Sequence, residues 1–458
     1  MQPRLTRYRA AMVWFPVLLV LVCFQVCFSQ EEEGWHSLDI AGCLEGKAEG
    51  VWSRAMDGED FQFGGTDRYA VYWRMLLPRL DLSKYPDAHF EIRGQFPHAT
   101  YFSFHVNTER TRFLNKMTDE DIEPDPGSSN PFRKGGEYRK GQTYTISVIQ
   151  DGQQGKVSRS NLLVIPESGS REEEYVVLYR MYEPLTGRDG GVTLPGVYLV
   201  AREGITDENR WKEECCKRIK GGGGVPDFLF GLEHRLDKRS QRLAKRTKQK
   251  AILYHPPDPI EFIIGDDFFG MVNHAFPAMP DFMIKNHPTG ANMDTRYLAA
   301  FLDPSKDVTV IRFKPPVAGK DVRYWSVSVY QPFNGLMYAY ATANYKDLQP
   351  DPDGFITIVF TDERQKPTFL YDPVNRQPPS GKYNWMPYGS KYPLIWFRYL
   401  LPSPSFQESP VYYSGDPYDG KAIRAHMKAF YPKAAYFTSR EFETSVQQGT
   451  LLQQFHDR

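Results

Sequence analysis

Three histidines and two aspartates form the densest group of side chains that could bind a metal. They are His255, His274, His287, Asp266 and Asp267. Zinc sites usually place at least two ligands a few residues apart, as in His-Glu-x-x-His. The spacings of 19 and 13 residues between the histidines match no such signature. We therefore predict no cofactor, with a transition-metal site at the three histidines as the alternative.

Two short acidic segments could supply oxygen ligands to calcium. Their members are Asp121, Glu123 and Asp125 in the first half, and Asp347, Asp351 and Asp353 in the second. Calcium favours loops rich in carboxylates. Asp next to Pro is also an ordinary turn former, because its carboxylate accepts a hydrogen bond from the backbone two residues on. We expect turns at both places, with calcium as the alternative.

Several polar and aromatic residues are candidates for binding a ligand. His98 and His105 lie seven residues apart around one strand-like segment, so a regular strand would point them to opposite faces. His98 and Tyr101 could line a pocket, whereas a turn histidine bonded to the backbone is the plainer interpretation. Tyr324 and Trp325 occupy the corresponding place in the second half of the chain.

Two arginines lie inside apolar strand-like segments at corresponding places in the two halves. They are Arg180 and Arg398. A charge at such a position needs a partner, because burying an unpaired ion is costly. The partner is an internal acid or an anionic ligand in a groove between the two halves.

No known catalytic motif accompanies these candidates. The sequence lacks Gly-x-Ser-x-Gly, and the glycine run 221–224 is not followed by Lys-Ser or Lys-Thr. Paired carboxylates for sugar cleavage come together only in three dimensions, so the sequence leaves the catalytic residues unknown.

Five sequence blocks recur in the same order in the two halves. They pair 68–69 with 296–297, 92–93 with 311–312, 101–106 with 324–329, 121–126 with 347–352, and 178–182 with 396–400. Strand-like segments 144–149 and 355–360 follow the fourth block, and the offsets vary only from 211 to 228. The constant order indicates an internal duplication in which loops changed length.

The repeated segments alternate in side-chain character, which is typical of a sheet with one packed face and one wetter face. We predict a mainly β protein with two tandem, internally duplicated antiparallel β-sandwich or jelly-roll-like units, which pack against each other. The expected division is a signal peptide (1–29), a first copy (30–200), a partly helical basic linker (201–258), a second copy (259–410) and a helical tail (411–458).

The N-terminus has the order of a secretory signal. Three arginines precede an apolar run at 10–28, and small residues favour cleavage after Ser29. An uncleaved signal anchor is the alternative. Cleavage would leave 53 basic and 56 acidic residues from the original 56 of each. This balance does not favour nucleic acid as a partner.

Three cysteines remain beyond the leader, Cys43 and the adjacent Cys215 and Cys216. An oxidising compartment favours a disulfide, and adjacent cysteines rarely pair with each other because the ring is strained. Cys43 is therefore expected to pair with either Cys215 or Cys216. The remaining cysteine would stay free or form a disulfide-linked dimer.

The linker contains a basic run at 234–250, with eight basic residues and one acid. A solvated helix is the plain interpretation. Proprotein processing at Lys238-Arg239 or Lys245-Arg246 is one alternative. Binding to an acidic polysaccharide or lipid surface is another.

The repeated blocks also resemble a known group of proteins. Segments 96–104, 121–132, 190–195, 323–326 and 384–385 are similar to an uncharacterised family of secreted or envelope proteins, best represented in actinobacteria. That family is distantly similar to β-sandwich domains of unknown function with an Arg-Tyr-Trp-Ser strand. The resemblance covers about 68–406 outside the linker and implies the fold and export, but no reaction. The linker departs from the family pattern, and the leader resembles eukaryotic ones.

Two functional hypotheses follow from this pattern. The first is a secreted, non-enzymatic matrix or ligand-binding component, whose sheets would expose Tyr and Trp to an extracellular polymer, lipid or protein. The second is a secreted enzyme acting on a glycan or lipid in the cleft between the copies. A processed precursor released at the dibasic sites is a third possibility. An enzyme should show an asymmetric cleft with convergent polar groups.

Overall fold

The computed structural model describes most of the two predicted copies. The described residues are 34–46, 50–58, 65–108, 113–157, 160–166, 174–222, 260–265, 292–303, 305–333, 336–374, 383–388 and 393–455. The predicted signal peptide, the dibasic sites and the three histidines of the candidate metal site lie outside them. No helix in the described part of the chain is long and apolar enough to cross a membrane.

The first copy is a sandwich of two five-stranded sheets. Its outer sheet has the order β1 (His36–Asp39), β10 (Gly196–Ala201), β4 (His89–Gln95), β7 (Thr143–Gln150) and β8 (Leu162–Ile165). Its inner sheet has the order β2 (Met56–Asp57), β3 (Ala70–Pro78), β9 (Glu174–Pro184), β5 (Ala99–Thr108) and β6 (Phe113–Thr118).

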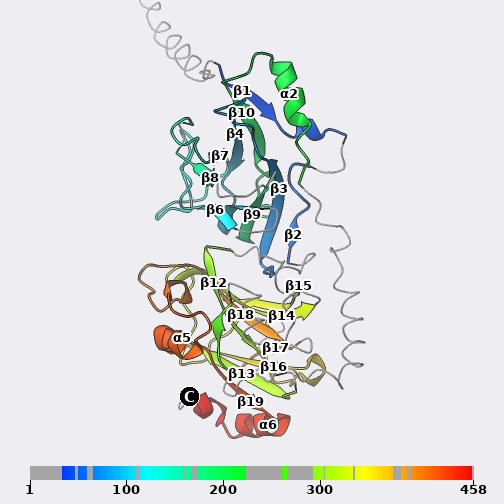
Figure 1. Cartoon of the computed structure of the whole chain (residues 1–458). Coiled ribbons are helices and arrows are strands. Elements are labelled where there is room, and N and C mark those ends of the chain that lie inside the picture. The colour runs from blue at the N-terminus through cyan, green and yellow to red at the C-terminus, as the bar shows by residue number, and fades with distance from the viewer. Residues whose placement is uncertain are drawn as a thin grey trace, which may run out of the picture.

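The second copy repeats this arrangement. Its inner sheet has the order β11 (Ile263–Ile264), β12 (Thr295–Phe301), β18 (Leu394–Pro402), β14 (Val322–Phe333) and β15 (Leu336–Asn344). Its outer sheet has the order β17 (Asn384–Pro387), β16 (Ile356–Thr361), β13 (Val308–Phe313) and β19 (Lys433–Phe437). In Figure 1 the first copy lies above the second, and β12, β14, β15 and β18 lie nearest to the first copy.

The predicted duplication and mainly β fold are confirmed strand by strand. β2 to β10 match β11 to β19 in chain order and in their neighbours within each sheet. The β7–β8 and β16–β17 pairs are both parallel, and β5 and β14 both carry a register shift, after Val106 and Val329 respectively. A shared bulge is a feature of a common fold, since bulges are conserved within families.

Two of the sequence alignments were out of register. Tyr72 pairs with Arg180 as Tyr297 pairs with Arg398, so the counterpart of Tyr297 is Tyr72 and not Tyr69. The block at 144–149 was wrong by one residue, because Ile146 and Ile358 are the equivalent partners of β4 and β13. A slip of one residue exchanges the two faces of a strand.

Side chains of each inner sheet alternate between two environments. In β5, Phe102, Phe104 and Val106 pack into the core of the first copy, whereas the alternate residues face the second copy. The face between the copies includes Tyr101 and Tyr182, together with Tyr324 and Leu400 of the second copy. The polar faces of the two inner sheets, which were predicted to face water, are thus packed against each other and buried. The candidate site lies where these two faces meet.

Helices close the ends of the molecule. Helix α2 (Glu208–Cys216) carries one half of the disulfide Cys43–Cys216, one of the two pairings left open by the sequence. In the tail, α5 (Gly420–Met427), α6 (Ser439–Gln447) and the 3₁₀ helix Leu451–Phe455 accompany β19. Phe442, Leu451 and Phe455 cover the outer face of β13 and β16.

Cys215 is free and burial raises the pKa of its thiol to about 11. A disulfide-linked dimer through this residue stays a prediction, which the low thiolate fraction does not favour.

We predict that Cys43→Ala lowers the free energy of unfolding by about 2–5 kcal/mol, because the disulfide closes a loop across the whole first copy. The loop spans 173 residues. Denaturant unfolding without reductant measures the change. Cys215→Ala, on the same helix, is the matched control; its partly buried side chain packs against the core of the first copy, so its loss should cost about 1 kcal/mol, less than the loss of the disulfide. Equal destabilisation by both variants would contradict the prediction.

Candidate functional site

Each inner sheet donates a hydrogen bond from an equivalent tyrosine to the other copy, and the two carboxylate acceptors lie at different positions of the turn before β3 and β12. Tyr101 of the first copy donates to Asp294 of the second at 2.5 Å, and Tyr324 of the second donates to Asp67 of the first at 2.9 and 3.0 Å. All four side chains are buried. A reciprocal exchange of this kind is typical of a two-fold interface between like units.

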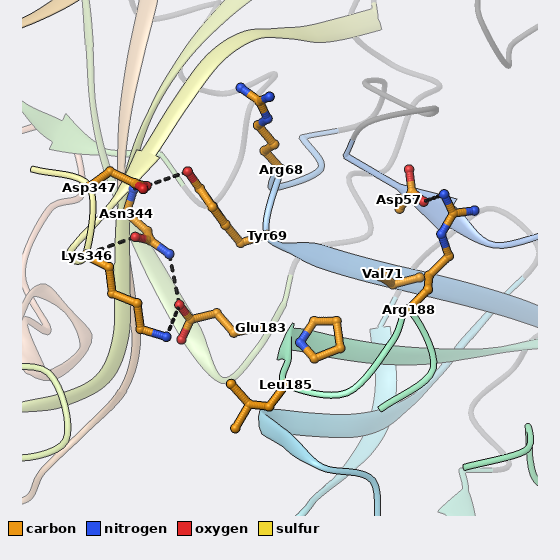
Figure 2. Close-up of a pocket in the computed structure, with 11 residues that line it drawn as sticks. Asp57, Arg68, Tyr69, Val71, Glu183, Leu185, Arg188, Asn344, Lys346 and Asp347 are labelled. Carbon is orange, nitrogen blue, oxygen red and sulfur yellow. Dashed lines mark hydrogen bonds and ion pairs between the residues drawn. The ribbon is translucent and has the colours of Figure 1, made fainter. Parts of the chain in front are cut away.

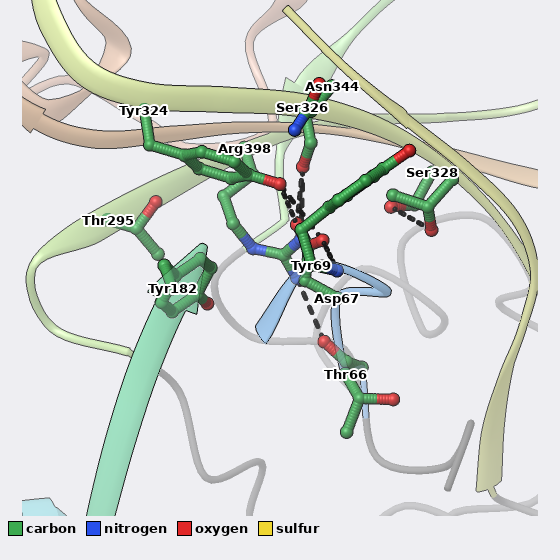
Figure 3. A network of polar contacts seen from close by, with 12 residues as sticks. Thr66, Asp67, Tyr69, Tyr182, Thr295, Tyr324, Ser326, Ser328, Asn344 and Arg398 are labelled. Atoms are coloured by element: carbon green, nitrogen blue, oxygen red, sulfur yellow. Dashed lines mark hydrogen bonds and ion pairs between the residues drawn. The ribbon is translucent and has the colours of Figure 1, made fainter. Parts of the chain in front are cut away.

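Arg398 forms the centre of the network in the second copy (Figure 3). Its guanidinium makes an ion pair with Asp67 and donates to the Gly65 carbonyl at 2.9 Å. Ser326 donates to the same Asp67 oxygen at 2.6 Å, and Tyr330 donates to the Thr66 carbonyl at 2.8 Å. The predicted internal acid of Arg398 therefore comes from the other copy.

The equivalent part of the first copy has a different chemistry. His105 is buried, and its Nε2 lies 3.4 Å from Asp294, which also pairs with Lys116. Burial, and then the charge of Arg180, lowers the pKa of His105 to about 4. Burial alone would raise the pKa of Asp294, but His105 and Lys116 hold it below its ordinary value.

A groove of about 520 Å³ lies where the two copies meet. It is shown in Figure 2. The first copy lines it with Asp57, Arg68, Tyr69, Val71, Glu183, Pro184, Leu185 and Arg188, and the second with Asn344, Lys346 and Asp347. The volume is within the usual range for a small-molecule site.

The charged side chains of the groove hold one another in place. Glu183 accepts from Asn344 and Lys346, both at 2.9 Å. Asp57 pairs with Arg188 at 2.6 Å. Asp347 accepts from the Tyr69 hydroxyl, and burial, followed by this bond, raises the pKa of Tyr69.

Glu183 is held by two further donors, the hydroxyls of Thr100 at 2.9 Å and Tyr345 at 3.0 Å. The Glu183 carboxylate thus accepts hydrogen bonds from four side chains of the two copies. Arg68 donates to the Val374 carbonyl at 3.4 Å and forms no ion pair with the described residues.

The place that corresponds to the groove on the other side of the interface is filled by an ion-pair network. Glu183 and Lys346 correspond in register to Leu401 and Glu120. There Arg323 reaches across from the second copy to pair with Asp119 and Glu120. Burial raises the pKa of Asp119 to about 7, against the opposing effect of Arg323. The duplicated scaffold thus carries different chemistry on its two sides.

The structure places the predicted ligand-binding residues in three environments. Arg180, Arg398, Tyr101 and Tyr324 lie buried between the copies. Trp325 points to the other face of β14, where it packs against Phe313 in the core of the second copy.

His98 precedes β5 and lies outside the groove. Its Nδ1 is 2.8 Å from the Thr186 hydroxyl, and its ring stacks on Tyr138 with 4.3 Å between centroids. The partner of this turn histidine is therefore a side chain and not the backbone.

The two acidic segments form turns. Asp351 accepts from the backbone of Asp353 at 3.0 Å and of Phe355 at 2.9 Å, and pairs with Arg312. In the first copy, Glu123 pairs with Arg133 at 2.6 Å. Among the described residues, no group of three His, Cys, Asp or Glu side chains could hold a metal ion.

The expected exposed aromatic surface is absent from the described residues. Their exposed large apolar side chains are Leu185, Met293, Val317, Phe369 and Tyr412, and none of them is Trp. Tyr101, Tyr182 and Tyr324 of the inner sheets are buried because the two copies cover each other's polar faces.

Sequence reasoning missed the groove residues Asp57, Tyr69, Glu183, Asn344 and Lys346. Their partners lie up to about 280 residues apart in the chain, so no local spacing signals them. Glu183 offered one hint, because it lies on the same strand as Arg180, β9, and occupies the place of Leu401 in the second copy.

Comparisons with known proteins give little further information. No protein-family model matches the chain, and no curated protein is a significant match. It is similar to a structure of an uncharacterised protein from Burkholderia cenocepacia (10% identity, TM-score 0.39, covering 82% of this chain and 78% of that one). It is also similar to the VPA0106 protein from Vibrio parahaemolyticus (12% identity, TM-score 0.36, covering 82% and 91%). These likenesses carry no argument about function.

We predict that Asp67→Ala lowers the free energy of unfolding by about 3–5 kcal/mol, because it leaves Arg398 buried without its carboxylate. Chemical denaturation measures the loss. The matched control is Asp353→Ala, which removes an exposed loop carboxylate and should change stability by about 0.5 kcal/mol or less. A small effect of Asp67→Ala would mean that another acid neutralises Arg398.

We predict that His105 makes the fold sensitive to acid. The pKa of His105 is about 4 in the folded protein and near 6.5 in the unfolded chain. Through this group the unfolded state binds more protons between these values, so His105 contributes a loss of stability of up to about 3 kcal/mol as pH is lowered from 6.5 to 4. Asp119, whose pKa is raised to about 7 in the folded protein, contributes in the opposite direction over the same range. Unfolding curves across this range measure the effect. His105→Gln should lose less stability than wild type when pH is lowered from 6.5 to 4, since only the contribution of His105 is removed, and identical slopes would contradict the assignment.

Proposed function

We propose that this protein is a secreted, non-enzymatic binding protein that holds a short neutral oligosaccharide in the groove between its two copies. The observation that carries the proposal is a groove of about 520 Å³ lined by polar side chains from both copies. A hydroxyl-rich ligand could exchange hydrogen bonds with carboxylate, amide, ammonium and guanidinium groups together.

The charge of the lining favours a neutral ligand. Its three basic residues are Arg68, Arg188 and Lys346, and its three acids are Asp57, Glu183 and Asp347. The lining is therefore balanced, which gives little general attraction for an anionic polymer. The ion pairs also hold the polar groups in position before a ligand arrives, and preorganisation reduces the entropy cost of binding.

The same contacts favour binding over catalysis. Glycoside hydrolysis needs one carboxyl that can donate a proton and a second that can act as base or nucleophile. Glu183 is bonded to four donors, and Asp57 is paired with Arg188. Both carboxylates are already engaged by neighbouring donors, and no observation favours the alternative of an enzyme.

The disulfide supports secretion. The Cys43–Cys216 bond is expected to persist in an oxidising compartment, and the N-terminal leader is consistent with export. An extracellular glycan is the partner class that agrees with this location and with the neutral groove.

We predict that Leu185→Trp weakens oligosaccharide binding at least tenfold, because the larger side chain would occupy the groove. Leu185 lines the groove and is 53% exposed. Titration calorimetry with neutral oligosaccharides, selected on a glycan array, measures the affinity. Sulfated oligosaccharides in the same array should bind no better than neutral ones.

Val317→Trp is the matched control, because Val317 is 54% exposed and lies outside the groove lining. It should bind with wild-type affinity. No binding of any neutral oligosaccharide by wild type, or an equal loss in both variants, would refute the proposal. Release of reducing sugar from the bound oligosaccharide would favour the enzyme instead.

A further inference from the structure

The carboxylate of Glu183 lines the groove but has no lone pair left for a ligand. Its Oε1 accepts from the Asn344 amide and from the Lys346 ammonium, both at 2.9 Å. Its Oε2 accepts from the hydroxyls of Thr100 at 2.9 Å and Tyr345 at 3.0 Å. Two carboxylate oxygens have about four lone-pair sites, and each of them is used here. Glu183 therefore positions its neighbours and does not bind the sugar itself.

The other carboxylates that line the groove are engaged as well. Oδ2 of Asp347 accepts from the Tyr69 hydroxyl and, at 3.0 Å, from the backbone of Asn344. Asp57 is buried and pairs with Arg188 at 2.6 Å. Because a sugar hydroxyl both donates and accepts, a ligand that presents only hydroxyls would find few acceptors among the described lining residues.

Hydrogen-bond donors remain open in the same groove. The Lys346 side chain is half exposed and carries three N–H groups. Its ammonium contacts Glu183 and the Tyr345 ring, which leaves at least one N–H for a ligand. Arg68 is exposed and donates one of its N–H groups to the Val374 carbonyl at 3.4 Å. The described lining therefore offers a ligand mostly donors.

An apolar patch accompanies these donors. Pro184 and Leu185 directly follow Glu183 in the chain and line the same groove. Leu185 is one of the few large apolar side chains exposed in the described part of the molecule. Figure 2 shows the Leu185 side chain and the Lys346 ammonium on the same side of Glu183. Covering the exposed leucine with an apolar group of a ligand is favourable, because it removes apolar surface from water.

A donor beside an apolar patch fits an acetamido group. Its carbonyl oxygen accepts hydrogen bonds, and its methyl group gains from burial. A hydroxyl at the same position of a sugar ring has no methyl group to place on Leu185. A free amine at that position would be protonated and repelled by Lys346. The acetamido group is also neutral, in agreement with the balanced charge of the lining.

We propose that the groove selects an oligosaccharide containing a 2-acetamido sugar, an N-acetylhexosamine. The acetyl carbonyl accepts from Lys346 and the methyl group packs on Leu185, while Arg68 donates to an oxygen of the adjoining sugar. This inference rests on the proposed function, since it names the sugar class that the groove binds. Leu185 is then the specificity-determining residue, and Glu183 is a positioning residue that acts through Lys346.

Two pairs of neutral oligosaccharides test the inference, because the members of each pair differ only in the acetamido groups. They are triacetylchitotriose with cellotriose, and N-acetyllactosamine with lactose. Titration calorimetry with the full secreted chain measures each affinity. The acetylated member of at least one pair should bind about tenfold more tightly, from one buried methyl group and one charge-assisted hydrogen bond.

Leu185→Ser separates the methyl contact from the rest of the site. It should weaken binding of the acetylated sugar about fourfold and leave the affinity for its hydroxyl counterpart unchanged. Val317→Ser is the matched control, because Val317 is similarly exposed but lies outside the groove lining, and it should keep the wild-type selectivity. Melting temperatures of both variants check that the fold is intact.

Saturation-transfer NMR gives a readout that does not depend on a variant. With the wild type, the acetyl methyl protons should receive the strongest saturation of the sugar. Equal affinities within both pairs, or unchanged selectivity in Leu185→Ser, would overturn the inference and leave oligosaccharide binding itself standing. Absence of binding by every neutral oligosaccharide would overturn the proposed function together with this inference.

Discussion

The buried charge of Arg398 is the constraint on which the arrangement of the two copies depends. A guanidinium with almost no exposed surface must meet an acid, and that acid, Asp67, is carried by the loop before β3 of the other copy. Such a pair contributes little to stability compared with apolar packing, but breaking it is costly. The pair therefore selects one relative orientation of the sheets and disfavours others.

This constraint makes the interface resemble a dimer contained in one chain. Tyr101 and Tyr324 are equivalent residues, and each donates to the acidic or amide turn of the opposite copy. In a true dimer both halves would keep the same side chains. Within one chain they diverged, so that Glu183 faces a groove on one side while Arg323 fills the other. The groove is therefore a product of divergence between the copies.

The sequence predicted the fold well because strand alternation and repeated order are local signals. It identified Arg180 and Arg398 as charges that need partners, yet it could not identify Asp67, which lies 331 residues from Arg398. The same alternation misled the prediction of exposed aromatics, since a wetter strand face has the same pattern whether water or a second sheet covers it. Register was predicted less well, because tyrosines recur every few residues around β3.

Both copies have the same unusual backbone bend at the end of an inner strand, but only the first copy places a carboxylate there. Glu183 and Leu401 both have φ of 45°, an unusual value for residues other than glycine. The backbone N–H of Glu183 donates to the carbonyl of Tyr69, just before β3, and that of Leu401 donates to the carbonyl of Asp294, just before β12. Because both copies share the strain, of about 1–3 kcal/mol, its cause is the scaffold and not a ligand. Only the first copy uses this bend to point a carboxylate into the groove. The functional difference between the copies therefore arises from side-chain exchange on a fixed, strained backbone.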